Sequence, residues 1–298
     1  MSDDDFSVAF HIGPHKTASS HLQQSLLLAA DDLADVGVRY YGPEHFRLPG
    51  RTIPALFGLR KKRGPGRTKR PANEQLALMR KGAGRLVLSE ENYIGDLSFS
   101  AAQVRGMRYP KAANSLAVLT AALDCPVDLF LCLRNPASLI NSVYSQMLYG
   151  QRIASPAQFK ALNPLESVNW TEFVARVRAV PGVRQVTVWM YEDYNVLFPK
   201  IISALVGDQH AARVPPVAGV IHPGLSSAAV AEILHRHAQG DTVGLADMAR
   251  RILSVQDGYP PYDGYSAREH AAADSAYANQ VAQIAAMPGV TLLSSAGV

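Results

Sequence analysis

The chain has 298 residues, of which 48% are hydrophobic and 18% are charged, and its net charge is +4. This composition is typical of a folded protein with a substantial core. It excludes a disulfide scaffold, because Cys125 and Cys132 are the only cysteines, and the small positive charge favours anionic ligands without requiring nucleic acid.

The first ten residues, MSDDDFSVAF, are acidic where an export signal would be basic. No apolar run approaches the roughly 18 residues that a membrane span requires. We therefore expect a cytoplasmic protein without a membrane span, in which Cys132 is a buried free thiol because it falls inside an apolar run.

Short apolar strands alternate with amphipathic helices along most of the chain. The pattern predicts strands over 6–13, 85–93, 127–135 and 183–191, and helices over 19–34, 112–123, 137–148 and 198–206. Asn135 followed by Pro136 indicates the start of a helix, with an N-cap and a first-turn proline. The alternation predicts an α/β fold with a central, mostly parallel sheet and helices on both faces.

After about Gly240 the pattern becomes helical, and the loops are rich in glycine, proline and tyrosine. No internal repeat or linker divides the chain. We expect a single domain over 1–298, with a core over about 1–240 and a helical, irregular C-terminal appendage over 241–298.

The segment HIGPHKTASSHLQ, from His11 to Gln23, joins the first strand to the first helix. In a parallel sheet such a loop presents backbone N–H groups and a positive helix end to the ligand crevice, so we expect it to bind an oxyanion. Lys16 adds a charge, and Thr17, Ser19 and Ser20 add hydroxyl donors. The loop does not follow GxxxxGK[ST], because the lysine comes too early and the second glycine is absent.

The same segment resembles HxGxxKTGTTxLQ, the 5′-phosphosulfate loop of the sulfotransferases that use 3′-phosphoadenosine-5′-phosphosulfate (PAPS). Ala18 stands in place of the usual glycine, and Ser19 and Ser20 stand in place of two threonines. The resemblance implies a sulfotransferase fold of the P-loop NTPase-like type. It also implies that the donor is held by Pro14, His15, Lys16, Thr17, Ala18, Ser19 and Ser20.

A second segment, RNPASLINS, resembles the family's signature for the 3′-phosphate and implies that Arg134 and Ser142 bind that group. Ser142 lies about two helical turns beyond Asn135 and therefore faces roughly the same direction. An arginine fork can bind two phosphate oxygens at once. Weaker similarities over 188–194 and 224–237 extend the resemblance over about the first 240 residues.

Sulfuryl transfer requires an in-line approach and stabilisation of charge on the departing oxygen, and Lys16 is the candidate for that stabilisation. The resemblance implies a glutamate or histidine base near a strand end, where LSEENY places Glu90 and Glu91. Adjacent strand residues point to opposite faces, so we expect one of them, first Glu90, to address the acceptor. His15 is an alternative base.

No metal site is expected, because His235 and His237 lie on different faces of a helix and no acid or cysteine cluster joins them. Every charged residue of the segment 47–70 is basic. It is either a solvated loop or a flap that attracts an acidic acceptor, such as a sulfated or uronic-acid sugar. A nucleic-acid partner is not expected, since few aromatic residues interleave with the charges.

The sequence thus predicts a PAPS-dependent sulfotransferase that acts on a hydroxyl or amine of a small-molecule or carbohydrate acceptor. Two alternatives stay open here. One is a small-molecule kinase that would require ATP and Mg²⁺, and the other is a non-catalytic protein that binds PAPS or its product, adenosine 3′,5′-bisphosphate (PAP). Neither the acceptor nor the oligomeric state follows from the sequence.

Overall fold

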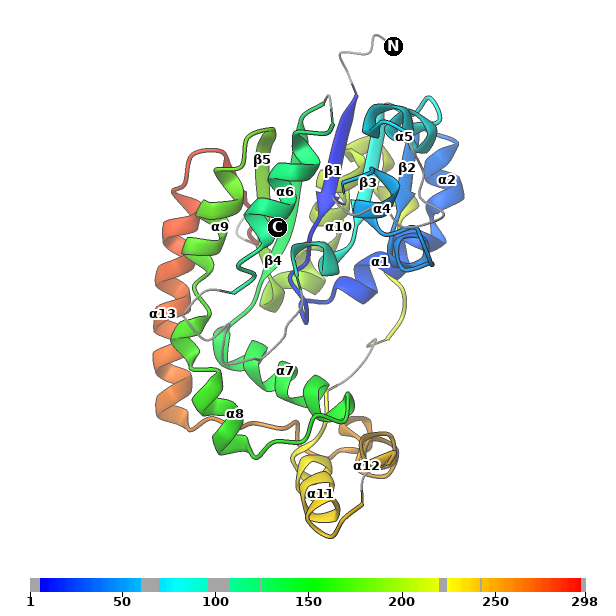
Figure 1. Ribbon diagram of the computed structural model, residues 1–298. Coiled ribbons are helices and arrows are strands. Elements are labelled where there is room, and N and C mark those ends of the chain that lie inside the picture. Colours follow the sequence, from blue (N-terminus) through cyan, green and yellow to red (C-terminus); the bar gives the residue numbers. More distant parts are fainter. Residues whose placement is uncertain are drawn as a thin grey trace.

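A six-stranded sheet in the order β2-β3-β1-β4-β5-β6 forms the centre of the molecule, and all five neighbouring pairs are parallel (Figure 1). The computed structural model describes residues 6–59, 70–95, 108–123, 125–219, 224–241 and 243–295. The strands are β1 (Ser7–His11), β2 (Val38–Tyr41), β3 (Arg85–Ser89), β4 (Val127–Leu133), β5 (Val183–Met190) and β6 (Val290–Leu292). The predicted α/β fold with a parallel sheet is confirmed.

The helices connect these strands. They are α1 (Ser19–Leu28), α2 (Ala30–Ala34), α3 (Pro43–Phe46), α4 (Ile53–Leu56), α5 (Ala72–Arg80), α6 (Ala112–Thr120), α7 (Pro136–Tyr149), α8 (Pro156–Leu162), α9 (Trp170–Arg178), α10 (Tyr194–Val206), α11 (Ser227–Ala238), α12 (Leu245–Ile252) and α13 (Ala267–Ala285). Short 3₁₀ turns are η2 (Glu91–Ile94), η4 (Leu165–Ser167), η5 (Tyr191–Asp193), η6 (Asp208–Arg213) and η7 (Val255–Asp257).

The sheet is covered on both faces, as the sequence predicts. Helices α6, α9 and α13 lie on one face, and α1, α2 and α10 lie on the other (Figure 1). Val8 and Phe10 of β1 point into the first layer and Ala9 into the second, because strand residues alternate between faces. The strand β4 is buried along its whole length, and Cys132 within it is a buried free thiol.

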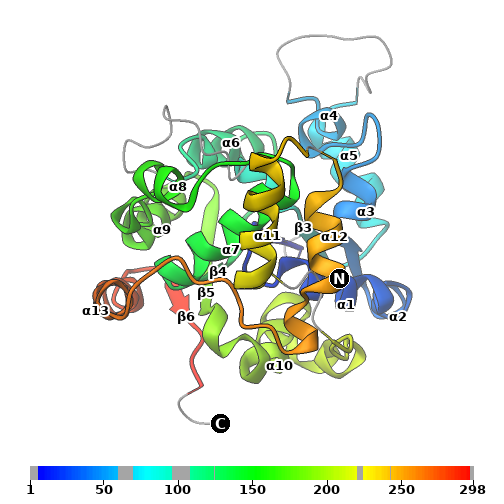
Figure 2. The same cartoon turned by 90° about the horizontal axis from the view of Figure 1, so that it is seen from below.

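Parallel strands bring their carboxyl ends to one edge of the sheet, which is the lower edge in Figure 1. Helix α7 crosses below this edge, and α11 and α12 pack against α7 and against each other. Figure 2 views the molecule from this side, with α11 and α12 in front of the strand ends. The loop after β1 and the turn after β3 therefore open onto the same space.

Four of the six strands agree with the sequence prediction. The two that it missed, β2 and β6, are the edge strands of the sheet and are too short to show a period of two. The predicted helix over 19–34 is interrupted at Ala29, which ends α1 and precedes α2. The segment after Gly240 holds α12 and α13, but it also supplies β6, which the helical pattern did not predict.

Candidate functional site

The loop between β1 and α1 turns sharply at three positions. Gly13, Lys16 and Ala18 have left-handed φ angles of 91°, 65° and 63°. A Cβ on Gly13 would lie 2.7 Å from the Cβ of Glu91, so a glycine is needed for this close approach. Ala18 adopts the left-handed conformation without glycine's freedom, at a cost of about 1–2 kcal/mol. The alanine therefore takes a conformation that a glycine at this position of the motif would adopt readily.

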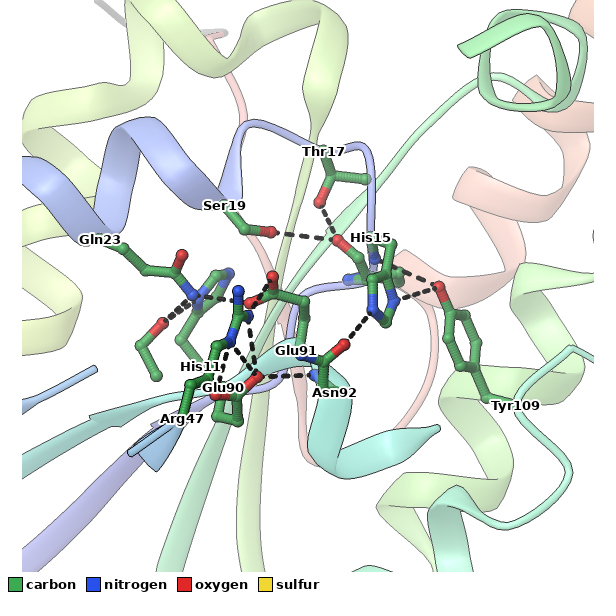
Figure 3. Close-up of polar contacts among 12 residues, drawn as sticks. His11, His15, Thr17, Ser19, Gln23, Arg47, Glu90, Glu91, Asn92 and Tyr109 are labelled. Atoms are coloured by element: carbon green, nitrogen blue, oxygen red, sulfur yellow. Dashed lines mark hydrogen bonds and ion pairs between the residues drawn. The ribbon is translucent and has the colours of Figure 1, made fainter. Parts of the chain in front are cut away.

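Two of the loop's hydroxyls are used to hold the loop itself. Thr17 Oγ1 and Ser19 Oγ both donate to the Pro14 carbonyl oxygen, at 2.5 Å and 3.2 Å (Figure 3). Both side chains are buried, whereas Ser20 is partly exposed in the first turn of α1. The first N–H groups of a helix have no partner inside it. The donors that this loop offers a ligand are therefore backbone N–H groups, the Ser20 hydroxyl and the Lys16 ammonium.

Lys16 lies among other cations. Its Nζ is 3.4 Å from Oε1 of Gln146 on α7. Burial and the charges of Arg134 and Arg250 lower the pKa of Lys16 from 10.5 to about 8. Among the described residues, no carboxylate forms an ion pair with any of these three cations. A bound anion would relieve their repulsion.

Arg134 follows β4 and is fixed against the loop. Its Nη1 donates to the Lys16 carbonyl oxygen, and its Nε donates to Ser138 Oγ at 2.9 Å. The guanidinium carbon also lies 4.1 Å from the ring centroid of Tyr191, which is a cation–π distance. Burial lowers the pKa of Arg134, although an arginine stays charged in proteins.

The helix after Arg134 begins as predicted. Asn135 Oδ1 accepts hydrogen bonds from the backbone N–H groups of Ala137 at 2.9 Å and Ser138 at 3.4 Å. Arg134 contacts Ser138, while Ser142 lies one turn further on the same face of α7 and is partly exposed. The signature that pairs Arg134 with Ser142 thus missed the nearer hydroxyl.

Glu90 and Glu91 form a pair around one arginine. Nη2 of Arg47 is 2.9 Å from Glu90 Oε1 and 2.7 Å from Glu91 Oε1, and its Nε is 3.1 Å from Glu90 Oε2 (Figure 3). Both glutamates are buried. The expectation that they point to opposite faces is wrong, because β3 ends at Ser89 and Glu91 already belongs to η2. Two carboxylates and one guanidinium leave a net negative charge.

Gln23, the last residue of the loop motif, lies on α1 and binds Glu91. Gln23 Nε2 donates to Glu91 Oε2 at 2.7 Å and to Ser89 Oγ at 3.1 Å, and Ser89 Oγ lies 2.8 Å from His11 Nδ1. Burial alone would raise the pKa of Glu91, but Arg47 and the hydrogen bond from Gln23 lower it below its ordinary value. His11 and Gln23 therefore support the carboxylate pair.

His15 connects the loop to Asn92, which follows the carboxylate pair in η2, and to Tyr109. Its Nε2 is 2.9 Å from Asn92 Oδ1, its Nδ1 is 3.1 Å from the Tyr109 hydroxyl, and the two rings stack with centroids 5.8 Å apart. The backbone N–H of Asn92 donates to Glu90 Oε1 at 3.1 Å. Both ring nitrogens of His15 are engaged, which favours a positioning role over that of a base.

Arg250 on α12 is a candidate site residue that sequence reasoning missed. Its charge contributes to the lowered pKa of Lys16, and its guanidinium carbon lies 5.5 Å from the ring centroid of Tyr149 on α7. Arg250 lies beyond the part of the chain that the motifs cover, so no local pattern could have linked it to the loop.

A cavity of about 410 Å³ opens beside Glu90. Its walls come from the residues around α3 and α4, from η2 and from α6. Asn92 belongs to this wall and also contacts His15, so the cavity and the Lys16 loop are neighbours.

The prediction of a flap over the site is not tested by these contacts. Of the basic segment 47–70, Arg47 binds the carboxylate pair, while residues 60–69 lie outside the described residues, so the flap stays a prediction.

Within the described ranges, no group of three or more His, Cys, Asp or Glu side chains could hold a metal ion. No helix in these ranges is long and apolar enough to cross a membrane.

Comparison with known proteins gives a similarity to solved structures. No protein-family model matches the chain, and no curated protein matches it. Among solved structures, it is similar to the crystal structure of a sulfotransferase from Alicyclobacillus acidocaldarius, with 19% identity and a TM-score of 0.41. The match covers 84% of this chain and 98% of that chain. A similarity of this size does not by itself assign a reaction to this chain.

Proposed function

We propose that the protein is a sulfotransferase that uses PAPS as donor and an alcohol as acceptor. The observation that carries this proposal is the packing of the cationic loop directly on the carboxylate pair, where Gly13 contacts Glu91. An anionic donor requires cations, and an acceptor hydroxyl requires a proton acceptor. The two requirements are met side by side.

The residues of the loop fit a donor with two separate anionic groups. Lys16 and the N-terminus of α1 would hold the 5′-phosphosulfate, and Arg134 with Ser138 and Ser142 would hold the 3′-phosphate. Arg250 would add a third positive charge. Burial lowers the pKa of Lys16 first, and repulsion from Arg134 and Arg250 lowers it further. This repulsion supports the assignment, because an anion between the cations would relieve it. When bound, PAPS supplies a sulfuryl group that is already attached to a good leaving group.

The carboxylate pair supplies the base. We assign proton acceptance to Glu90, because it lines the cavity, and a positioning role to Glu91, because it contacts Gly13 and Gln23. When Glu90 accepts a proton, Arg47 keeps Glu91 as an anionic partner, so the guanidinium is not left unpaired. Lys16 stabilises the negative charge that develops on the departing oxygen.

Calorimetric titration with PAP tests the donor site, with 5′-AMP and ATP–Mg²⁺ as controls. We expect PAP to bind at least about tenfold more tightly than 5′-AMP, because a charge-assisted contact to the 3′-phosphate contributes on the order of 1.5–3 kcal/mol. Transfer is then measured with isotopically labelled PAPS and a panel of alcohols. Preference for ATP–Mg²⁺ would contradict the proposal and support a kinase, and PAP binding without transfer to any alcohol would support a non-catalytic binder.

A further inference from the structure

The cavity beside Glu90 is the part of the site that the loop motifs do not describe. It has a volume of about 410 Å³, and its wall includes Glu90 and Asn92 of the carboxylate side. Asn92 also contacts His15, the residue before Lys16. A molecule in this cavity would therefore lie next to the loop that carries the anion-binding residues.

The volume limits the size of the occupant. Sites for small molecules usually measure about 300–1,000 Å³, so this cavity is at the lower end of the range. It suits a compound of one or two rings. A longer sugar chain would have to extend out of it.

The charge of the cavity limits the occupant further. Among the described residues that line it, Arg47 and Glu90 are the only charged side chains. Arg47 already binds both Glu90 and Glu91, so it has no unpaired charge to offer an anion. An anionic occupant would instead face the net negative charge of this group, which disfavours it. This contrasts with the acidic acceptor that the flap interpretation of the basic segment 47–70 would favour.

The remaining walls are largely apolar. Phe46 and Ile53 are buried on one side, Leu59 lies near them, and Val118 is 42% exposed on α6. Tyr93 donates its hydroxyl to the Ser115 carbonyl oxygen at 2.6 Å, so it offers the cavity mainly its ring. Thr52, Asn114 and Ser115 add a few polar groups to the walls. Such walls favour a ring that carries few hydroxyls over a sugar, because more of the sugar's hydroxyls would lose their water against apolar side chains.

We infer that the cavity binds a small, uncharged, ring-containing alcohol, of which phenols are the simplest examples, with its hydroxyl directed at Glu90. The inference rests on the proposed function, in which this alcohol is the sulfuryl acceptor. As the acceptor oxygen forms its bond to sulfur, the bond between sulfur and the bridging phosphate oxygen breaks. The acceptor proton passes to the Glu90 carboxylate, and the departing PAP keeps the electron pair of the broken bond.

A matched pair of ligands tests the charge requirement without relying on turnover. The PAP-saturated protein is titrated at pH 7 with 2-naphthol and with 6-hydroxy-2-naphthoate, which have the same rings and hydroxyl but differ by one carboxylate. We expect 2-naphthol to bind at least about tenfold more tightly. Equal or tighter binding of the naphthoate, or no binding of 2-naphthol, would overturn the inference.

A matched pair of variants tests the location. Val118→Trp fills the cavity from an exposed rim position, and Ala121→Trp places the same side chain at an exposed position of the same segment outside the cavity. We expect Val118→Trp to lower the affinity for 2-naphthol at least tenfold while PAP affinity stays unchanged, and Ala121→Trp to change neither. Unchanged naphthol affinity in Val118→Trp would place the alcohol elsewhere and overturn the inference.

The two levels of the proposal fail differently. If the protein does not bind PAP, the sulfotransferase assignment is wrong and the acceptor inference falls with it. If PAP binds but 2-naphthol does not, only the acceptor inference is wrong, and a search among other alcohols is justified.

Discussion

The two halves of the candidate site are neighbours in space but opposite in construction and charge. The loop half, with Lys16 as its central charge, comes from one contiguous segment and faces the partly buried cation Arg134. The carboxylate half combines Arg47 from after α3 with Glu90 and Glu91 from after β3, and it has a net negative charge. The close approach of Gly13 to Glu91 joins them, together with the hydrogen bonds from Gln23 to Glu91 and between His15 and Asn92.

This difference explains how one site could serve two substrates of opposite character. Cations without carboxylate partners favour a multiply charged anion, whereas carboxylates that share one guanidinium keep a second anion out and can accept a proton. Changes in the loop half should therefore act on the donor and on the transition state. Changes in the carboxylate half should act on the acceptor and on proton transfer.

The largest effect is expected from Lys16→Ala. We expect kcat to fall at least about 100-fold, because removal of one positioned donor to a developing negative charge typically has an effect of this size. Turnover with a fixed alcohol acceptor measures it. Lys111→Ala, at an exposed position that precedes α6, is the control and should retain full activity. Near-normal turnover of Lys16→Ala would remove this lysine from catalysis.

The paired variants Glu90→Gln and Glu91→Gln separate the roles within the carboxylate half. We expect Glu90→Gln to lower kcat about 100-fold or more with unchanged PAP affinity, because a positioned base contributes roughly 10²–10⁴-fold. Glu91→Gln should have a smaller effect, since it acts through Arg47 and Gln23. A larger loss in Glu91→Gln would mean that the two roles are exchanged.

The halves also differ in how well the sequence predicts them. The residues of the loop half could be selected as candidates from His11 to Gln23, because they are contiguous and their conformation is set by local turns at Gly13, Lys16 and Ala18. The carboxylates were found as candidates, but their shared partner was not. Arg47 follows a four-residue helix and lies far from Glu90 in sequence, so no spacing links them.

Two further misreadings have physical causes. The prediction that Glu90 and Glu91 diverge assumed that β3 continues, whereas a 3₁₀ turn begins at Glu91 and brings both carboxylates to one guanidinium. The hydroxyls of Thr17 and Ser19 were expected to face an anion, yet they bind the Pro14 carbonyl oxygen. A residue type indicates which hydrogen bonds are possible, but only the backbone path decides which one forms.

The next effect, of intermediate size, concerns the 3′-phosphate. We expect Arg134→Ala to weaken PAP binding about 10- to 100-fold, which corresponds to the loss of a charge-assisted contact, and to change 5′-AMP binding much less. Calorimetry with both nucleotides measures the difference. Ser138→Ala and Ser142→Ala show which hydroxyl of α7 assists. Equal PAP affinities of Arg134→Ala and the parent protein would contradict the assignment of this arginine.

The smallest effect follows from the pKa of Lys16, which burial, Arg134 and Arg250 lower to about 8. An anion bound between these cations should raise that pKa again, so PAP binding near pH 8 should take up a proton and should weaken as the pH rises above 8. Calorimetry in two buffers of different ionisation enthalpy measures the uptake, which should be absent in Lys16→Met.

The same shift has a consequence for the free protein. The pKa of Lys16 is lower in the folded protein than in the unfolded chain, so the charged lysine destabilises the fold below pH 8. This destabilisation disappears as the pH rises from about 8 to 10.5. Lys16→Met should therefore raise the free energy of unfolding at pH 7 by roughly 1–3 kcal/mol, and this gain should vanish above pH 10.5. Denaturant unfolding at both pH values measures it. A variant that is less stable than the parent at pH 7 would show that Lys16 is compensated within the fold, and that the loop half holds no repulsion for an anion to relieve.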